Sequence, residues 1–549
     1  MKSRSGSASK VSDVTDFFYR TEDIAPKDVT KYFAETDRDR SIIDSLKSRA
    51  PTVMVGSRGV GKSFLLRIAE QELFQDFEKD RVFPVYVSFV RSSLIRSSDP
   101  ERFQRWMLAR LCSAAIRALE KRGLLGALPR SVKLIAGSDI GAKIEKTRIE
   151  EIAEQYEASY RSPEIEVSGD ELPTTEDFRE AFEDLSEDLE IKRFVFLIDE
   201  AAHIFLPEQQ RQFFTLFRDL RSHCLVCKAA VYPGVTSYGE TFQPTHDASI
   251  VEIDRDVMDA GYVDHMREMV EKQADANTLK NVLRNGQNFA ILAYAASGNP
   301  RLLLKTLAEA PKVASGEVNE AIRKFYRSNI WAEHTDLADK YVGHKEIIDW
   351  GRLFVEESVL PAIKTRNDLA LSAGRDTSAY FWVHRNAPET VKEALRILSY
   401  TGIVKEGESG IRATRSEVGR RYFVNLGCLF ALETTPTRTS FEIAKSLSIK
   451  RMTEYGSNHP VFEPIADIDL ETIDDEDGFA LAPHLSKDIS VLDLTDWQKD
   501  KLRELELTTV GQVLEASEAD LKLAKWVGDV RARRMRNAAV ASVLEYLSG

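Results

Sequence analysis

Apolar runs alternate with amphipathic stretches over the first half of the chain. Short runs rich in β-branched and aromatic residues, the pattern of strands buried on both faces, lie at 51–55, 82–90, 193–198, 224–231 and 249–253. Stretches with the apolar spacing of helices lie at 64–74, 100–122, 175–191 and 207–222. Strands and helices that follow one another in this way predict an α/β domain with a parallel sheet, ending near residue 256.

A glycine-rich loop joins the first predicted strand to the first predicted helix. It reads Gly56, Ser57, Arg58, Gly59, Val60, Gly61, Lys62 and Ser63, which matches the pattern G-x-x-x-x-G-K-[ST]. Glycines allow backbone amides to curl around phosphate oxygens, and the helix N-terminus adds partial positive charge. We therefore expect Gly56 through Phe64 to contact a nucleotide, with Lys62 at the outer phosphates and Ser63 on Mg²⁺.

Two carboxylates end the apolar run at 193–198. Asp199 and Glu200 stand where a parallel strand would finish, and open α/β sheets bind their ligands at that edge. We expect Asp199 to hold Mg²⁺, usually through water, and Glu200 to orient and deprotonate the attacking water. After the next strand, Thr236 or Ser237 is the candidate to position this water.

A turn at Gly298, Asn299, Pro300 and Arg301 begins a helix in the mainly helical segment that follows residue 256. Proline suits an early helical position, and Arg301 would project from the helix start. An arginine there can reach phosphates from a lid and respond to whether the nucleotide is intact.

Taken together, these three motifs resemble the Walker A, Walker B and sensor 2 elements of AAA+ ATPases. The Gly-Asn-Pro-Arg form is similar to that of the origin-recognition and replication-initiator branch, and of some related signalling NTPases. The resemblance covers roughly residues 25–310. It implies a P-loop α/β core with a helical lid, ATP and Mg²⁺ as cofactors, and catalytic roles for Lys62, Glu200, Arg301 and Thr236.

The sequence departs from this family after the predicted strand at 224–231. The family places a trans-acting arginine there, which would require a homo-oligomer, yet Tyr232 to Asp254 contains neither arginine nor lysine. Arg218, Arg221 or Arg255 are the substitutes, and each is equally well explained as a surface ion-pairing residue.

The segment 376–440 resembles a winged-helix domain. A helix is expected at Glu389 to Tyr400, then a hairpin at 403–414 with its turn at 406–410, then a second helix at Ser416 to Leu426. Arg412 and Arg415 could contact DNA phosphates, but glutamates nearby mix the charge. A winged helix that packs against protein is the alternative.

The last segment, 491–549, resembles tandem helix-hairpin-helix modules. Its glycine turn at Gly528 would present backbone amides to a DNA phosphate without reading sequence. The residues expected at DNA here are Lys525, Gly528, Arg531, Arg533 and Arg534. Trp526 occupies the position where the family prefers its first glycine, so protein binding is the alternative to duplex DNA.

Composition limits these interpretations. The net charge of −13 argues against a uniformly basic surface, so any DNA contact must come from local patches. Cys224 and Cys227 form a C-x-x-C within a predicted buried strand and are read as core residues rather than metal ligands. No apolar run approaches the roughly 18 residues of a membrane span, which predicts a cytoplasmic protein without membrane partners.

The predicted domains are a flexible N-terminus (1–24), the nucleotide-binding core (25–256) with an insertion at about 124–174, a helical lid (257–312), a helical connector (313–375), the winged-helix-like segment (376–440), a partly acidic linker (441–490) and the helix-hairpin-helix-like segment (491–549). The predicted function is an ATP-binding, ATP-hydrolysing initiator-like switch that couples nucleotide state to DNA binding. The alternative is a signalling NTPase of a mobile-element or host-defence system whose C-terminal modules bind a protein.

Overall fold

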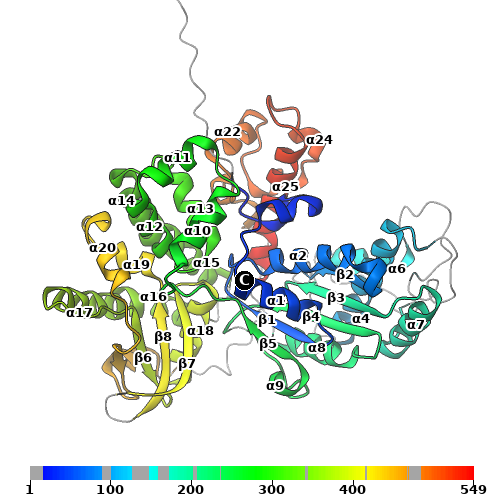
Figure 1. Ribbon diagram of the computed structural model, residues 1–549, viewed down its shortest axis with the longest axis horizontal. Helices are drawn as coiled ribbons and strands as arrows, with labels where there is room; N and C mark the ends of the chain where they lie inside the picture. Colours follow the sequence, from blue (N-terminus) through cyan, green and yellow to red (C-terminus); the bar gives the residue numbers. More distant parts are fainter. Residues whose placement is uncertain are drawn as a thin grey trace, which may run out of the picture.

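The computed structural model describes residues 17–89, 100–125, 136, 147–158, 172–201, 207–234, 236–340, 344–413, 417–466, 468 and 484–548. Figure 1 shows a lobe built on one sheet, a second lobe of helices with a smaller sheet, and a C-terminal domain above both. Within the described residues, none of the helices combines the length and the apolar character that crossing a membrane requires.

The sheet of the first lobe has five strands in the order β2-β3-β4-β1-β5, and every neighbouring pair is parallel. The strands are β1 (Thr52–Val55), β2 (Val82–Ser88), β3 (Arg193–Asp199), β4 (Leu225–Val231) and β5 (Ser249–Glu252). All residues of β3 and β4 are buried, as strands covered on both faces require. The predicted α/β class with a parallel sheet is confirmed.

Alternate side chains of β3 enter two different cores. Val195 and Leu197 pack with α1 (Asp37–Lys47) and α2 (Lys62–Gln75) on one face. Phe194 and Phe196 pack on the other face with a second group of helices. These helices are α4 (Pro100–Lys121), α6 (Arg148–Ala158), α7 (Thr175–Asp188) and α8 (Pro207–Asp219), and the short α3 (Phe77–Asp80) and α9 (Pro244–Asp247) complete the lobe. The sheet is therefore held between two helical layers.

The second lobe begins with a run of helices. They are α10 (Tyr262–Glu271), α11 (Ala276–Arg284), α12 (Gly286–Ala295), α13 (Pro300–Glu309), α14 (Ser315–Lys324), α15 (Ile330–Lys340), α16 (Lys345–Leu353) and α17 (Leu360–Ser372). One apolar core extends from Tyr262 to Ile465. The predicted lid, connector and winged-helix-like segments therefore share a single core.

A four-stranded sheet in the order β7-β8-β6-β9 completes this lobe. Its elements are β6 (Tyr380–His384), α18 (Glu389–Tyr400), β7 (Val404–Arg412), β8 (Val418–Val424), α19 (Leu426–Phe430), α20 (Pro436–Lys445) and β9 (Thr453–Tyr455). The predicted helix at 416–426 is wrong, because its β-branched and aromatic residues form β8 between two partner strands. The predicted turn at 406–410 is also wrong, since β7 passes through it with register irregularities and turns back after Arg412.

Two predicted flexible segments are partly ordered. Phe17 is buried in the core of the second lobe, so residues 17–24 do not belong to a flexible N-terminus. β9 pairs with β6, and Phe462 is buried, so residues 441–466 belong to the second lobe rather than to a linker. Residues 467 and 469–483, which include the acidic cluster, lie outside the described residues. So do residues 1–16 and most of the predicted insertion.

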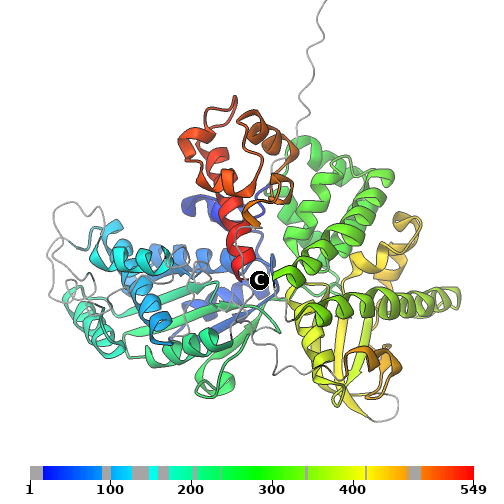
Figure 2. The ribbon, with the colours of Figure 1, turned by 180° about the vertical axis from the view of Figure 1, so that it is seen from behind.

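The C-terminal domain has its own apolar core. It contains α22 (Asp496–Glu504), α23 (Val510–Glu515), α24 (Glu518–Leu521) and α25 (Asp529–Ser548). The first three helices each begin at a capping box, formed by Thr495, Thr509 and Ser517, which satisfies amides that short helices cannot bond internally. Helix α25 leaves this domain and descends between the two lobes, as both views show (Figures 1 and 2).

Candidate nucleotide-binding site

A cavity of about 390 Å³ lies at the carboxyl edge of the parallel sheet. The loop after β1 lines it at one end, and residues from the lid, the N-terminal segment and α25 line the rest. Its size falls in the usual range for small-molecule sites, and its position is the one where open parallel sheets bind ligands.

The predicted loop closes onto the N-terminus of α2. Gly61 is the N-cap of this helix with a φ of 103°, and Gly59 has a φ of 84°. A Cβ atom at Gly59 would lie 2.8 Å from Oδ1 of Asn299 and 2.9 Å from Cβ of Arg301. Glycine is therefore needed at Gly59 both for the backbone angle and for the close approach of the lid.

Lys62 lies buried at the centre of this loop. Its Nζ donates to the backbone oxygens of Gly56 (2.6 Å) and Ser57 (3.1 Å). The same Nζ lies 3.7 Å from the centre of the Tyr232 ring. Burial lowers the pKa of Lys62 to about 8, although the charges of Glu200 and Asp199 act in the opposite direction. The ammonium is held at the loop by contacts that phosphate oxygens could replace.

Asp199 and Ser63 offer adjacent oxygen ligands. The Ser63 hydroxyl is hydrogen-bonded to the Asp199 carboxylate, which also accepts a hydrogen bond of 2.6 Å from the hydroxyl of Tyr86. Burial, and then the charge of Glu200, raise the pKa of Asp199 to about 6. A hard oxygen pair of this kind suits Mg²⁺, which would neutralise phosphate charge there.

Glu200 is held by a residue that the sequence analysis missed. The Tyr232 hydroxyl lies 3.0 and 2.8 Å from the two carboxylate oxygens of Glu200 and donates to them. Glu200 has a φ of 56°, a left-handed conformation that non-glycine residues adopt at a cost of about 1–2 kcal/mol. Tyr232 directly follows β4, so the predicted strand at 224–231 was enough to place this residue at the carboxyl edge of the sheet.

Thr236 is not among the residues that line the cavity, and its hydroxyl donates to the backbone oxygen of Tyr232 at 2.6 Å. The amide of Ser237 donates to Oε1 of Gln210. Both residues therefore bond within the segment after β4, and the predicted place of Thr236 at the cavity is corrected: Tyr232 lines the cavity instead.

Two arginines approach the loop from its lid side. Arg301 lines the cavity, and its Nε donates to the backbone oxygen of Tyr19 at 3.0 Å. Asn299 caps α13 and donates to the backbone oxygen of Arg58 at 2.7 Å. Arg255 donates to the backbone oxygen of Val60 at 2.7 Å. Burial lowers the pKa of both Arg255 and Arg301.

The contacts of Arg255 fit neither of the two roles that the sequence analysis considers for it. It is buried, and it pairs with Asp39 at 3.5 Å beside its own loop. It is therefore neither a surface ion-pairing residue nor directed toward another subunit. Arg218 bonds to Asp219 and to the backbone of Thr241, away from this cavity.

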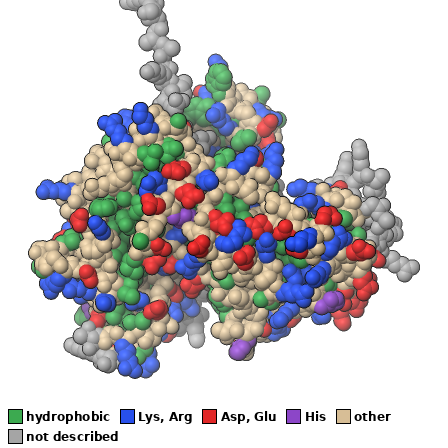
Figure 3. Space-filling model, viewed as in Figure 1, with side chains coloured by type: hydrophobic (Ala, Val, Ile, Leu, Met, Phe, Trp, Pro, Cys, Tyr) green, Lys and Arg blue, Asp and Glu red, His purple; other side chains and the backbone are tan. Residues whose placement is uncertain are grey.

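The residues expected at DNA are distributed unevenly. Lys525, Gly528, Arg531 and Arg533 are exposed on the C-terminal domain, and Arg412 is exposed at the end of β7, whereas Arg415 lies outside the described residues. The prediction that Arg534 contacts DNA is corrected. Its side chain is only 4% exposed, and its Nη2 donates to the backbone oxygen of Phe17 at 2.7 Å. On the face shown in Figure 3, basic and acidic side chains are interspersed.

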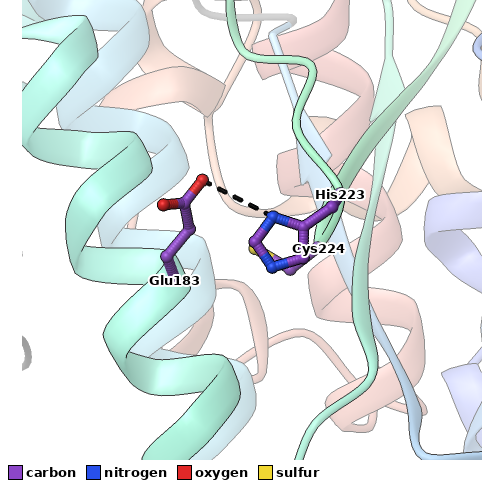
Figure 4. A group of neighbouring side chains, drawn as sticks. All are labelled: Glu183, His223 and Cys224. Carbon is purple, nitrogen blue, oxygen red and sulfur yellow. Dashed lines mark ion pairs between the residues drawn. The ribbon is translucent and has the colours of Figure 1, made fainter.

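A separate cluster lies on the first lobe (Figure 4). The potential ligand atoms of Glu183, His223 and Cys224 are within 4.8 Å of one another. His223 Nδ1 lies 3.8 Å from Glu183. Burial raises the pKa of the Cys224 thiol, which opposes the thiolate form that metals bind. The cluster is explained as a surface ion pair beside a core cysteine, in agreement with the sequence analysis.

The order of the parallel strands, with the glycine loop after β1 and a helical lid behind it, defines an α/β P-loop core of the AAA+ type. No protein-family model matches the chain, and no curated protein matches it either.

Two solved structures are similar in architecture. The Orc1 protein of Aeropyrum pernix, solved in complex with DNA, is 16% identical with a TM-score of 0.29, covering 76% of this chain and 94% of that one. DnaA of Aquifex aeolicus, solved with AMPPCP, is 11% identical with a TM-score of 0.27, covering 62% of this chain and 85% of that one. Values this low do not bear on function.

Proposed function

We propose that this protein binds ATP with Mg²⁺ and hydrolyses it as a nucleotide-dependent switch. The observation that carries the proposal is that Lys62, Glu200 and Arg301 line a single cavity, with the buried Asp199 hydrogen-bonded to Ser63 beside them. These residues come from the glycine loop, the end of β3 and the start of α13. Cationic donors, an oxygen ligand pair and a general base are what phosphoryl transfer to water requires.

Each residue has a distinct task in this proposal. The loop amides and Lys62 bind the β- and γ-phosphates, while Ser63 and Asp199 hold Mg²⁺. Glu200 accepts the proton of the attacking water, and Tyr232 fixes the orientation of that carboxylate through its hydroxyl. Arg255 and Arg301 place two further cations around the loop from the same chain, which offsets the lack of arginine between Tyr232 and Asp254.

Substitution of Glu200 tests the catalytic part of the proposal. Glu200→Gln keeps the size of the side chain and the contact with Tyr232 but removes the base. We expect ATP binding within about twofold of the unchanged protein and turnover reduced about 10²- to 10⁴-fold. Glu190→Gln is the matched control, since Glu190 also has a positive φ, of 51°, but is exposed. Turnover that survives in Glu200→Gln would refute Glu200 as the base.

We further propose that the switch acts on duplex DNA through the C-terminal domain. Lys525, Arg531 and Arg533 are exposed near the turn at Gly528, where an added Cβ would meet nothing within 4 Å. Duplex affinity should fall steeply with salt, and the double change Arg531→Ala and Arg533→Ala should reduce the slope of log affinity against log salt by about 2. An unchanged slope would contradict this assignment.

A specific observation favours a second candidate, a signalling NTPase whose C-terminal domain binds a protein. Leu523, Trp526 and Val530 are 77%, 72% and 62% exposed around the same turn. Large apolar side chains exposed together are typical of protein interfaces. Salt-insensitive capture of one protein that is lost in Trp526→Ala, together with no duplex binding, would favour this candidate over DNA.

A further inference from the structure

The cavity that contains Lys62 is also lined by the C-terminal helix. Asn537, Val540 and Ala541 of α25 contribute to its wall, although they lie far beyond the AAA+ motifs in the sequence. Figure 2 shows this helix running from the C-terminal domain into the space between the lobes. The same cavity therefore has one end built by the loop and another end to which a separate domain contributes.

Aromatic and aliphatic side chains give part of this cavity the chemistry of a base-binding compartment. Phe18 and Tyr32 lie with ring centres 5.3 Å apart, and Phe33 and Phe64 with centres 6.0 Å apart. All four rings line the cavity, as do aliphatic side chains of the lid and of α25. Flat apolar walls favour a nucleobase, whereas the phosphates must lie at the N-terminus of α2.

Helix α25 is fixed in this position by polar contacts with the N-terminal segment. Nη2 of Arg534 donates to the backbone oxygen of Phe17 at 2.7 Å, and its guanidinium lies 5.3 Å from the centre of the Tyr19 ring. Asp493 of the same domain lies 3.9 Å from Arg20 and 3.6 Å from Lys305 of the lid. A buried arginine and an ion-pair network at one junction indicate a defined docking contact.

The docking contact reaches the phosphate side of the cavity. The backbone oxygen of Tyr19 accepts the hydrogen bond from Arg301, while the ring of Tyr19 lies beneath Arg534. The segment from Phe17 to Arg20 is therefore held between the lid arginine on one side and the C-terminal helix on the other. Movement of α25 would disturb the lid arginine through a single short segment.

We infer that the base of the bound nucleotide occupies a composite compartment in which Asn537, Val540 and Ala541 of the C-terminal domain form one wall. This inference rests on the proposed function. It makes the C-terminal domain part of the nucleotide site of its own chain. By thermodynamic reciprocity, nucleotide binding stabilises the docked C-terminal domain by the same factor by which docking raises nucleotide affinity. Binding or release of the nucleotide would then shift the position of the C-terminal domain, and with it the surface around Trp526.

The first test compares two ligands that share phosphates but differ in the base. Ala541→Trp would fill the compartment from α25, so ATP should bind about tenfold more weakly or worse, because the indole occupies the volume that the base needs. Inorganic tripolyphosphate, which has no base, should bind within about twofold of the unchanged protein. Arg536→Trp adds the same side chain at an exposed position of α25 and should leave both affinities unchanged.

The outcomes separate this inference from the proposed function. If the unchanged protein binds neither ligand, the proposed function fails and the inference fails with it. If the unchanged protein binds both ligands through Lys62 but Ala541→Trp binds ATP normally, only the inference is wrong. Equal loss of ATP and tripolyphosphate in Ala541→Trp also counts against it, because the compartment would then not be specific to the base.

A second measurement uses the unsubstituted chain. Hydrogen exchange of the amides from Asn537 to Ala541 should slow by about tenfold or more when ATP is added, since a docked helix opens less often. Tripolyphosphate should protect the loop amides but have a much smaller effect on α25. Protection confined to the loop with both ligands would overturn the inference.

Discussion

The two ends of the proposed nucleotide site are built in opposite ways. The phosphate end comes mainly from one continuous loop, Gly56 to Ser63, together with the residues that end β3. The base end is assembled from Phe18, Phe33, Leu304 and Ala541, which are spread over more than five hundred positions of the chain. Local chemistry is therefore concentrated in a motif, whereas the shape of the site depends on how distant segments pack.

This difference has a consequence for regulation. Most residues proposed for the phosphate end belong to the first lobe, with Arg301 added from the second, while the base end also needs the C-terminal domain. Arg301 donates to the backbone oxygen of Tyr19 and Arg534 lies over its ring, so this residue joins the two ends. Changes at either end test whether they work as one site.

Among the changes that compare the two ends, the largest effect is expected from crowding the phosphate end. Gly59→Ala places a Cβ 2.8 Å from Asn299 in a backbone with a φ of 84°. ATP affinity measured by calorimetry should fall about tenfold or more, because the lid must move away from the loop. Gly410→Ala is the control, since it has a φ of 77° with open space around its Cβ. Both changes should cost about 1–2 kcal/mol of stability, but Gly410→Ala should keep its ATP affinity.

A somewhat smaller effect is expected from loosening the base end. Arg534→Ala removes the hydrogen bond to Phe17 and leaves that buried carbonyl without this donor. We expect ATP affinity to fall about three- to tenfold, by loss of docking rather than of phosphate contacts. Arg533→Ala, at the neighbouring exposed position, should bind ATP normally. Equal ATP affinities in the two variants would show that the ends are independent.

Removal of one hydroxyl tests the catalytic part of the phosphate end. Tyr232→Phe keeps the ring over Lys62 and against Tyr400 of α18, whose ring centre lies 5.4 Å away, but no longer donates to Glu200. Turnover should fall about three- to tenfold because the carboxylate loses orientation. ATP affinity should stay within about twofold. Unchanged or faster turnover would contradict the orienting role of Tyr232.

The smallest expected effect is a pH dependence at the docking contact. Burial raises the pKa of Asp23 from 3.8 to about 6, despite the opposing charges of Arg534 and Arg20. The neutral form is therefore favoured in the folded protein, and its stabilisation is lost as the pH rises through 6. Asp23→Asn should melt about 2 °C above the unchanged protein at pH 7.

The difference between Asp23→Asn and the unchanged protein should close as the pH falls toward 4, where both side chains are neutral. Comparing the two proteins at each pH cancels the titration of other groups. If Asp23→Asn were less stable than the unchanged protein at pH 7, the attraction between the Asp23 carboxylate and the nearby arginines would outweigh the cost of burying its charge.

The residues that the sequence assigns to the phosphate end lie close together in the structure, for a physical reason. Backbone geometry and ligand chemistry restrict Gly59, Lys62 and Asp199 to a few residue types at fixed spacing. Strands buried on both faces are likewise recognisable, because β3 and β4 are continuous apolar runs. The predicted position of each of the five strands agrees with the structure to within two residues at nearly every boundary.

The remaining features depend on long-range packing. The segment that forms β8 has two adjacent arginines and no strict alternation of polar and apolar residues, and its pairing with β6 and β7 decides the outcome. Arg534 looks like its exposed basic neighbours in sequence, yet it faces Phe17 across more than five hundred positions. No local pattern distinguishes such a residue from Arg533.

The most direct test of the central claim is a titration with ATP and Mg²⁺ of the unchanged protein, Lys62→Ala and the control Lys79→Ala, whose side chain is exposed on α3. Lys62 contributes the buried ammonium at the phosphate end, so its loss should weaken ATP binding at least about 100-fold. Lys79→Ala should bind as the unchanged protein does. Lys62→Ala with undiminished ATP affinity would contradict the account.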